Sequence, residues 1–284
     1  MFDILFINPI INLLVGIYHL LLLIRVPSTL GVSIILVSIA IRLILYPFTR
    51  SYLKASKKMQ SLTPHLSRLK ERHKGDSKKI QEETMLLYKE HGVNPLAGCL
   101  PMLVQIPIAW GLYSVLQKVA QLNAKATLAY VNGAAYGPYF RLNHVWDTIF
   151  FGIPLEKTPH QLQASWGVIV FIFPIATAVF QYIQSAMMLP EVADAAKKEL
   201  VIKKTIVKKE EVKKDDFASA MQTQSLYLFP IMIGFASFNF PIALSLYWNT
   251  FTIFGIMQQY RVSGWGGFSS SLAKLRTMIW KIKK

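Results

Sequence analysis

Apolar stretches alternate with lysine-rich stretches along the whole chain. Five apolar runs are long enough to cross a bilayer as helices, because backbone polar groups in hydrocarbon must be satisfied within each helix. They lie at residues 29–49, 93–117, 165–189, 222–239 and 241–260. The last two runs are nearly contiguous, so we expect a tight hairpin between them at one membrane surface. This pattern predicts an all-α polytopic membrane protein.

Residues 1–28 are also apolar, but their small and polar residues follow a helical repeat. Asn8, Asn12, Gly16 and His19 are four, four and three positions apart, which lines them along one helical face. Such a helix favours the membrane interface, so we predict an amphipathic interfacial helix. An uncleaved signal-anchor is the alternative.

The first basic segment, residues 50–92, has apolar positions at helical spacing. We predict a cytoplasmic helical hairpin in which Pro64 either kinks the first arm or starts a new helix at Thr63. The two arms would face each other through one apolar stripe each: Met59, Leu62, Leu66 and Leu69 on the first arm, and Ile80, Met85, Leu86 and Leu87 on the second. A solvated basic linker is the alternative.

The other three segments outside the apolar runs differ in composition. Residues 118–164 hold Gly, Pro and aromatic residues, which suits an external loop of short interfacial helices and turns. Residues 190–221 form a charged loop to which we assign no function. The tail at 261–284 carries 6 basic residues. It could anchor on anionic lipid or contact ribosomal RNA phosphates, and its composition does not decide between them.

The charge distribution predicts the orientation. The chain has 31 Lys plus Arg and 15 Asp plus Glu, a formal balance of +16. Residues 50–92 carry 11 basic residues and the charged loop carries 8, whereas the whole opposite side carries 5. Basic loops are retained in the cytoplasm. We therefore expect an external N-terminus and a cytoplasmic C-terminus.

Arg42 lies inside the first apolar run, where burying its charge in lipid costs about 2.5 to 3.5 kcal/mol. The five runs contain no Asp or Glu, so an ion pair within the membrane is ruled out for this chain. Arg42 either extends to the interface or faces a hydrated cavity. The polar residues that could line such a cavity are Ser33, Ser38, Gln105, Gln181, Gln184, Ser245, Asn249 and Thr250.

The same absence of acids excludes several function classes. Proton and sodium carriers and aspartyl intramembrane proteases depend on such groups. The chain also lacks the HExxH, GxSxG and GxxxxGK[ST] motifs. Its one cysteine, Cys99, cannot form an internal disulfide. We therefore expect no enzyme activity, no cofactor and no metal.

The residues from Arg42 onward carry a recognisable pattern. Arg42 is followed by Tyr46-Pro47 and the basic hairpin. The run from His91 to Pro101 (HGVNPLAGCLP) then leads into Gln105-Ile106-Pro107, and the last apolar run contains Leu246-Tyr247-Trp248. Over residues 4–262 the chain resembles the YidC/Oxa/Alb family of membrane protein insertases. Because no large external domain is present, it is similar to the compact five-span bacterial form.

The resemblance implies five helices around a hydrophilic groove that is open to the cytoplasm and to lipid and closed outside. Arg42 would be its positive charge, with Gln105, Gln181 and Trp248 beside it, and the hairpin would receive substrates or partners. The implied function is insertion of newly made membrane proteins by a monomer in a bacterial plasma membrane. Ribosome binding through the tail and cooperation with the Sec translocon stay open. A small-anion or polar-solute transporter is the alternative, and an assembly factor is a third class.

Overall fold

The computed structural model describes residues 1–73, 75–93, 100–121, 124–189, 224–269 and 272. The chain is mainly helical and divides into two compact units. The first comprises Met1–Phe48, Cys99–Gln181 and Pro230–Gly255, and the second comprises the remaining segments. The charged loop and most of the basic tail predicted from the sequence lie outside the described residues.

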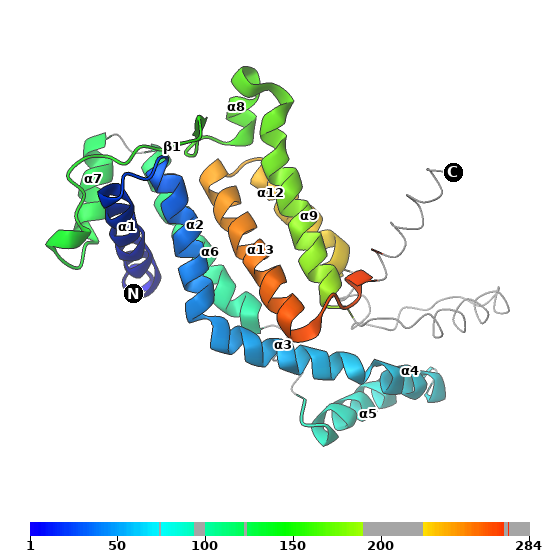
Figure 1. The fold of residues 1–284 in the computed structure, drawn as a ribbon. Coiled ribbons are helices and arrows are strands. Elements are labelled where there is room, and N and C mark those ends of the chain that lie inside the picture. Colours follow the sequence, from blue (N-terminus) through cyan, green and yellow to red (C-terminus); the bar gives the residue numbers. More distant parts are fainter. Residues whose placement is uncertain (74, 94–99, 122–123, 190–223, 270–271, 273–284) are drawn as a thin grey trace. The chain divides into compact units, whose positions relative to one another are not determined.

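The first unit contains most of the apolar helices (Figure 1). Its main helices are α1 (Asn8–Leu23), α2 (Thr29–Ile44), α6 (Leu100–Gln121), α9 (Ile172–Met187), α12 (Phe229–Ser237) and α13 (Ile242–Ser263). Of these, α9 belongs to the first unit up to Gln181 and α13 up to Gly255, and the remainder of each belongs to the second unit. Shorter elements are η1 (Asp3–Ile7), α7 (Ala124–Gly133), η3 (Pro138–Phe140), β1 (Ile149–Phe150), β2 (Ile153–Pro154), α8 (Pro159–Trp166) and η4 (Gly167–Phe171). The described part of the chain is therefore that of an all-α membrane protein with one short β-hairpin.

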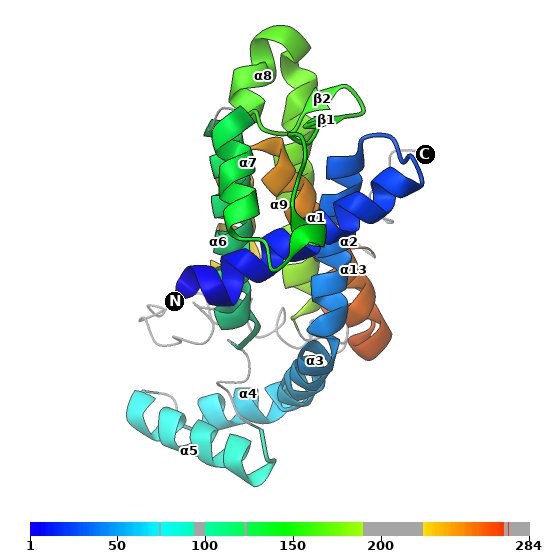
Figure 2. The ribbon, with the colours of Figure 1, turned by 90° about the vertical axis from the view of Figure 1, so that its left-hand side faces the viewer.

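Helix α1 runs across the direction of α2 and α6, as Figure 2 shows. Its predicted polar face is used for contacts inside the unit. The Asn12 amide donates to the Ala134 carbonyl at 2.8 Å and accepts from the Tyr136 backbone N–H at 2.8 Å. His19 Nδ1 lies 2.8 Å from the Tyr139 carbonyl oxygen. The polar stripe therefore holds α1 against the segment that follows α7.

The predicted external loop is packed against the helix starts. The N–H groups of Ile242 and Ala243, which have no partner within α13, donate to the carbonyls of Lys157 and Leu155 at 2.9 Å. At the β1–β2 turn, the Phe151 N–H donates to the Ser28 hydroxyl just before α2. This segment therefore caps the start of α13 and is bonded to the residue just before α2, which a loose loop would not do.

Two described helical segments are long and apolar enough to cross a bilayer, Asp3–Leu23 and Pro159–Met187. The bent pair α2 and α3 would be a third if counted as one span. The observed bounds differ from the predicted runs by a few residues; for example, α2 ends at Ile44 where the run continues to residue 49. The count of five spans and the interfacial position of residues 1–28 stay predictions.

The second unit contains the predicted cytoplasmic hairpin. Its helices are α3 (Tyr46–Ser61, from Thr49), α4 (Thr63–Arg72) and α5 (Ser77–Glu90), and η5 (Gln224–Leu228) also lies here. The start of α4 at Thr63 confirms the effect expected of Pro64. The prediction that Met85 and Leu86 face the first arm is wrong, because they are 54% and 58% exposed. They follow Ile80 by five and six residues, a spacing that places them off its helical face.

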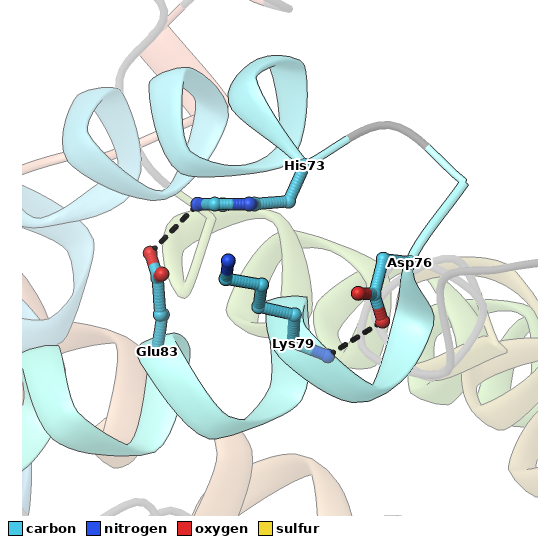
Figure 3. Close-up of polar contacts among 4 residues, drawn as sticks. All are labelled: His73, Asp76, Lys79 and Glu83. Atoms are coloured by element: carbon cyan, nitrogen blue, oxygen red, sulfur yellow. Dashed lines mark hydrogen bonds and ion pairs between the residues drawn. The ribbon is translucent and has the colours of Figure 1, made fainter.

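The tip of the hairpin is ordered by two polar contacts, shown in Figure 3. The Asp76 carboxylate accepts the Lys79 backbone N–H at 3.0 Å and so caps α5. His73 Nε2, at the end of α4, lies 3.0 Å from the Glu83 carboxylate on α5. Gly75 sits between them with φ of +94°, a conformation that suits glycine.

Helix α3 contacts the residue that follows α9 within the second unit. The Gln60 amide donates to the Met188 carbonyl at 2.6 Å, and the Tyr52 hydroxyl donates to the Met188 sulfur at 3.7 Å. Burial raises the pKa of Tyr52 to about 12, so its hydroxyl stays protonated at neutral pH. The Gly267 N–H, past the end of α13, donates to the Leu189 carbonyl at 2.8 Å.

Candidate functional site around Arg42

Arg42 lies near the end of α2 and is only 7% exposed. Its Nε–H donates to the Phe251 carbonyl on α13 at 2.9 Å, and its Cζ lies 3.6 Å from the centre of the Phe251 ring. The side chain is therefore held against a neighbouring helix.

Helix α9 presents an inverted pattern of burial. Its exposed residues Ile172, Ile175 and Val179 are apolar, whereas the buried face carries Thr177 and Gln181. A helix in water would turn its polar residues outward. The pattern is typical of a helix with lipid on one side and a polar interior on the other.

Gln181 is joined to α13 by a side-chain hydrogen bond. The Trp248 indole N–H donates to Gln181 Oε1 at 3.2 Å. Trp248 is three residues from Phe251, so both lie on the same face of α13. One face of α13 thus connects to Arg42 on α2 and to Gln181 on α9.

A polar stripe lies beside that face of α13. Ser245, Asn249 and Thr252 are spaced by four and three residues, and at 3.6 residues per turn they neighbour the face of Trp248 and Phe251. The Ser245 hydroxyl and the side-chain amide oxygen Oδ1 of Asn249 are buried with no hydrogen-bond partner in the described part of the chain. Buried polar atoms of this kind are ordinarily satisfied by water.

The other predicted site residues have no described contact with Arg42 or with the polar stripe. The Ser38 hydroxyl donates to the Ile34 carbonyl at 2.6 Å, and Thr250 donates to Leu246 at 2.8 Å, so both are satisfied within their own helices. The side chain of Gln105 lies outside what the structure describes. Gln184 falls in the second unit and is not placed relative to Arg42.

The electrostatics of this region rest on one cation. Among the described residues no carboxylate forms an ion pair with Arg42. The contact of His73 with Glu83 belongs to the hairpin and does not involve Arg42. Within the same residues no group of three or more His, Cys, Asp or Glu side chains could hold a metal ion. The arrangement can attract and orient an anionic group, and it offers no nucleophile activated by a neighbouring base.

Comparison with known proteins identifies the family. Residues 22–265 match the family described as 60Kd inner membrane protein. The chain belongs to the YidC/Oxa/Alb family of membrane protein insertases. The match includes Arg42, Gln181, Trp248 and Phe251, and it confirms the resemblance inferred from the sequence motifs.

Individual relatives in the family carry insertase names. The chain is 32% identical to the membrane protein insertase MisCA of Bacillus subtilis (strain 168) over 82% of this chain and 70% of the relative. It is 29% identical to the membrane protein insertase YidC 2 of Bacillus anthracis over 84% of this chain and 73% of the relative. The chloroplastic ALBINO3-like protein 1 of Arabidopsis thaliana is 28% identical over 92% of this chain and 48% of that protein.

Sequence reasoning missed Thr252 of the polar stripe and, more importantly, Phe251. Phe251 contacts Arg42 through a backbone carbonyl, which every residue possesses, and through a ring that looks like any other apolar residue of a span. Its spacing of three from Trp248 is the signal that could have identified it, because residues three apart share a helical face.

Proposed function

We propose that this protein inserts newly made membrane proteins into the lipid bilayer, and that Arg42 is the positive charge of a hydrated groove along α13. The family membership supports the activity. The observation that carries the role of Arg42 is its burial against Phe251 without a described acidic partner. The unpartnered Ser245 and Asn249 oxygens support hydration of the groove.

The physical task of an insertase is to move the polar flank of a substrate across the bilayer. Water reaching partway into the membrane shortens the dry path, and a cation in a low dielectric attracts an acidic flank strongly. Burial of the apolar segment then contributes about 0.8 kcal/mol per CH2. The membrane potential contributes about 2.3 kcal/mol per charge per 100 mV. No nucleotide hydrolysis is needed.

We further propose the topology that the charge distribution predicts. Five spans at 29–49, 93–117, 165–189, 222–239 and 241–260 surround a groove closed outside, with the N-terminus outside and the C-terminus in the cytoplasm. The transverse course of α1 supports an interfacial position for residues 1–28. The cap that the 118–164 segment supplies to α13, and its hydrogen bond to Ser28 just before α2, support closure at that end.

The partners follow from the same function. Newly made membrane proteins are the substrates, and the bilayer of a bacterial plasma membrane is the working environment. The basic hairpin at 50–92 receives substrates, and the basic tail provides a surface for ribosomal RNA. The protein works as a monomer, with or without the Sec translocon. A small-anion transporter has no support from the family.

The decisive experiment replaces Arg42 by Ala and by Lys in the full chain, reconstituted in vesicles. Two single-span substrates are compared, one with an acidic flank and one with a neutral flank of equal length. We expect Arg42→Ala to slow the acidic substrate about tenfold, which corresponds to about 1.4 kcal/mol. Arg42→Lys should retain part of the rate, because it keeps the charge and loses the planar fork.

The matched control is Arg68→Ala, which removes an exposed charge from the hairpin. Equal rates of the acidic substrate in Arg42→Ala and in the unmodified protein would refute the role of Arg42. Ion conductance by the purified protein in planar bilayers would instead favour the transporter.

A further inference from the structure

Arg42 meets α13 through one residue in two ways. Phe251 accepts the Nε–H of Arg42 at its carbonyl oxygen, 2.9 Å away, and covers the guanidinium with its ring at 3.6 Å. Phe251 is itself 9% exposed. The ring restrains the plane of the guanidinium, and the hydrogen bond occupies Nε, one of its three nitrogens.

The hydrogen bond decides which donors remain. A guanidinium can bind a carboxylate side-on, through Nε and one terminal nitrogen, or end-on, through both terminal nitrogens. Because the Nε–H of Arg42 is given to the Phe251 carbonyl, the side-on mode is blocked. The end-on pair is then the bidentate mode open to an anion.

The ring has a separate effect. A cation over an aromatic face is stabilised most where water is excluded, and stacking restricts the rotation of a long, flexible side chain. An aliphatic side chain of similar size would fill the space without either effect. The backbone carbonyl, in contrast, is kept by any substitution at this position.

We infer that Phe251 is a positioning residue, which holds Arg42 so that it binds the acidic flank of a substrate end-on. This inference rests on the proposed function and deepens it. It assigns to an apolar residue of α13 a part in discriminating acidic from neutral flanks. Phe251 touches the guanidinium and acts on the substrate through it.

The test uses the ratio of insertion rates for the acidic and neutral substrates, because a general packing defect would slow both. Phe251→Leu removes the ring, and Phe251→Tyr keeps it. We expect Phe251→Leu to slow the acidic substrate about twofold to fivefold, the range of a cation–π contact at a site that water reaches, and to leave the neutral one unchanged. Phe251→Tyr should retain the ratio of the unmodified protein.

Two further variants control for packing. Phe254→Leu makes the same chemical change on α13 at a residue with no described contact to Arg42, and it should leave the ratio unchanged. If Phe251→Leu does not accumulate in the membrane, Phe251→Met removes the ring while retaining a flexible apolar side chain, and the same loss is expected. In the Arg42→Ala background, Phe251→Leu should cause no further change in the ratio.

The results separate two failures. If Arg42→Ala slows the acidic substrate while Phe251→Leu leaves the ratio unchanged, the positioning role is overturned and the proposed function stands. A Phe251→Leu variant that slows both substrates equally also overturns it, since packing alone would explain the loss. If Arg42→Ala itself has no effect, the proposed role of Arg42 fails first.

Discussion

Arg42 and the basic hairpin hold positive charge in opposite ways. Arg42 is a single buried cation, packed on Phe251 and paired with no described acid. Residues 50–92 carry 11 basic residues, of which those on α4 and α5 are mostly exposed among acids on the same helices. A charge in water is screened and interchangeable, whereas a buried charge packed against other groups depends on each neighbour. Insertion should therefore respond far more to the loss of Arg42 than to the loss of any single basic residue of the hairpin.

Charge reversal gives the largest expected contrast. Arg42→Glu places an anion against the Phe251 carbonyl and ring, and an uncompensated buried charge costs about 3 to 5 kcal/mol. Arg68→Glu, on the exposed face of α4, should change stability by no more than about 0.5 kcal/mol. Denaturant unfolding of both variants in detergent micelles measures the difference. Similar costs for the two would break the contrast.

An intermediate effect is expected at the contact between α13 and α9. Trp248→Phe removes the indole N–H and leaves the buried Gln181 amide oxygen without that donor, which costs about 1 to 3 kcal/mol. The double variant Trp248→Phe with Gln181→Leu should recover part of this loss, since neither partner is then left unsatisfied. A double-mutant cycle measured by unfolding tests the coupling. Strict additivity would show that the two side chains act independently.

The smallest effect is expected in the hairpin. Glu83→Gln removes the charge that faces His73, and partly exposed pairs contribute about 0.2 to 1 kcal/mol. Amide hydrogen exchange over α5 in the full chain should rise by less than about sixfold. Glu82→Gln, on the exposed side of the same helix, is the matched control and should leave exchange unchanged. A larger rise in Glu83→Gln would mean that the tip contact organises the whole hairpin.

The sequence was most informative where local rules act. Apolar length predicted the long helices, and Pro64 predicted an interruption of the first arm, which is observed as the start of α4 at Thr63. The sequence prediction was wrong about which side of a helix some apolar residues occupy. Met85 and Leu86 were assigned to the interface between the arms because they are apolar, yet the helical repeat turns them outward.

The site could be predicted only in part. Arg42 stands out because a cation in an apolar run is costly, and that reasoning needs no partner. The pairing of Gln181 with Trp248 joins residues 67 positions apart, and such distant contacts depend on the packing of whole helices. Phe251 contacts Arg42 partly through its backbone carbonyl, which no side-chain pattern records.

The two N–H groups that α13 donates to the carbonyls of Lys157 and Leu155 limit how this helix can move. A slide along its axis would pull both donors away from their acceptors, whereas a tilt about that end keeps them in place. Phe251 lies nine residues beyond Ile242, a lever arm of roughly 13 Å at 1.5 Å per residue. Small angular changes at the tethered end would therefore become ångström-scale separation of Phe251 from the guanidinium.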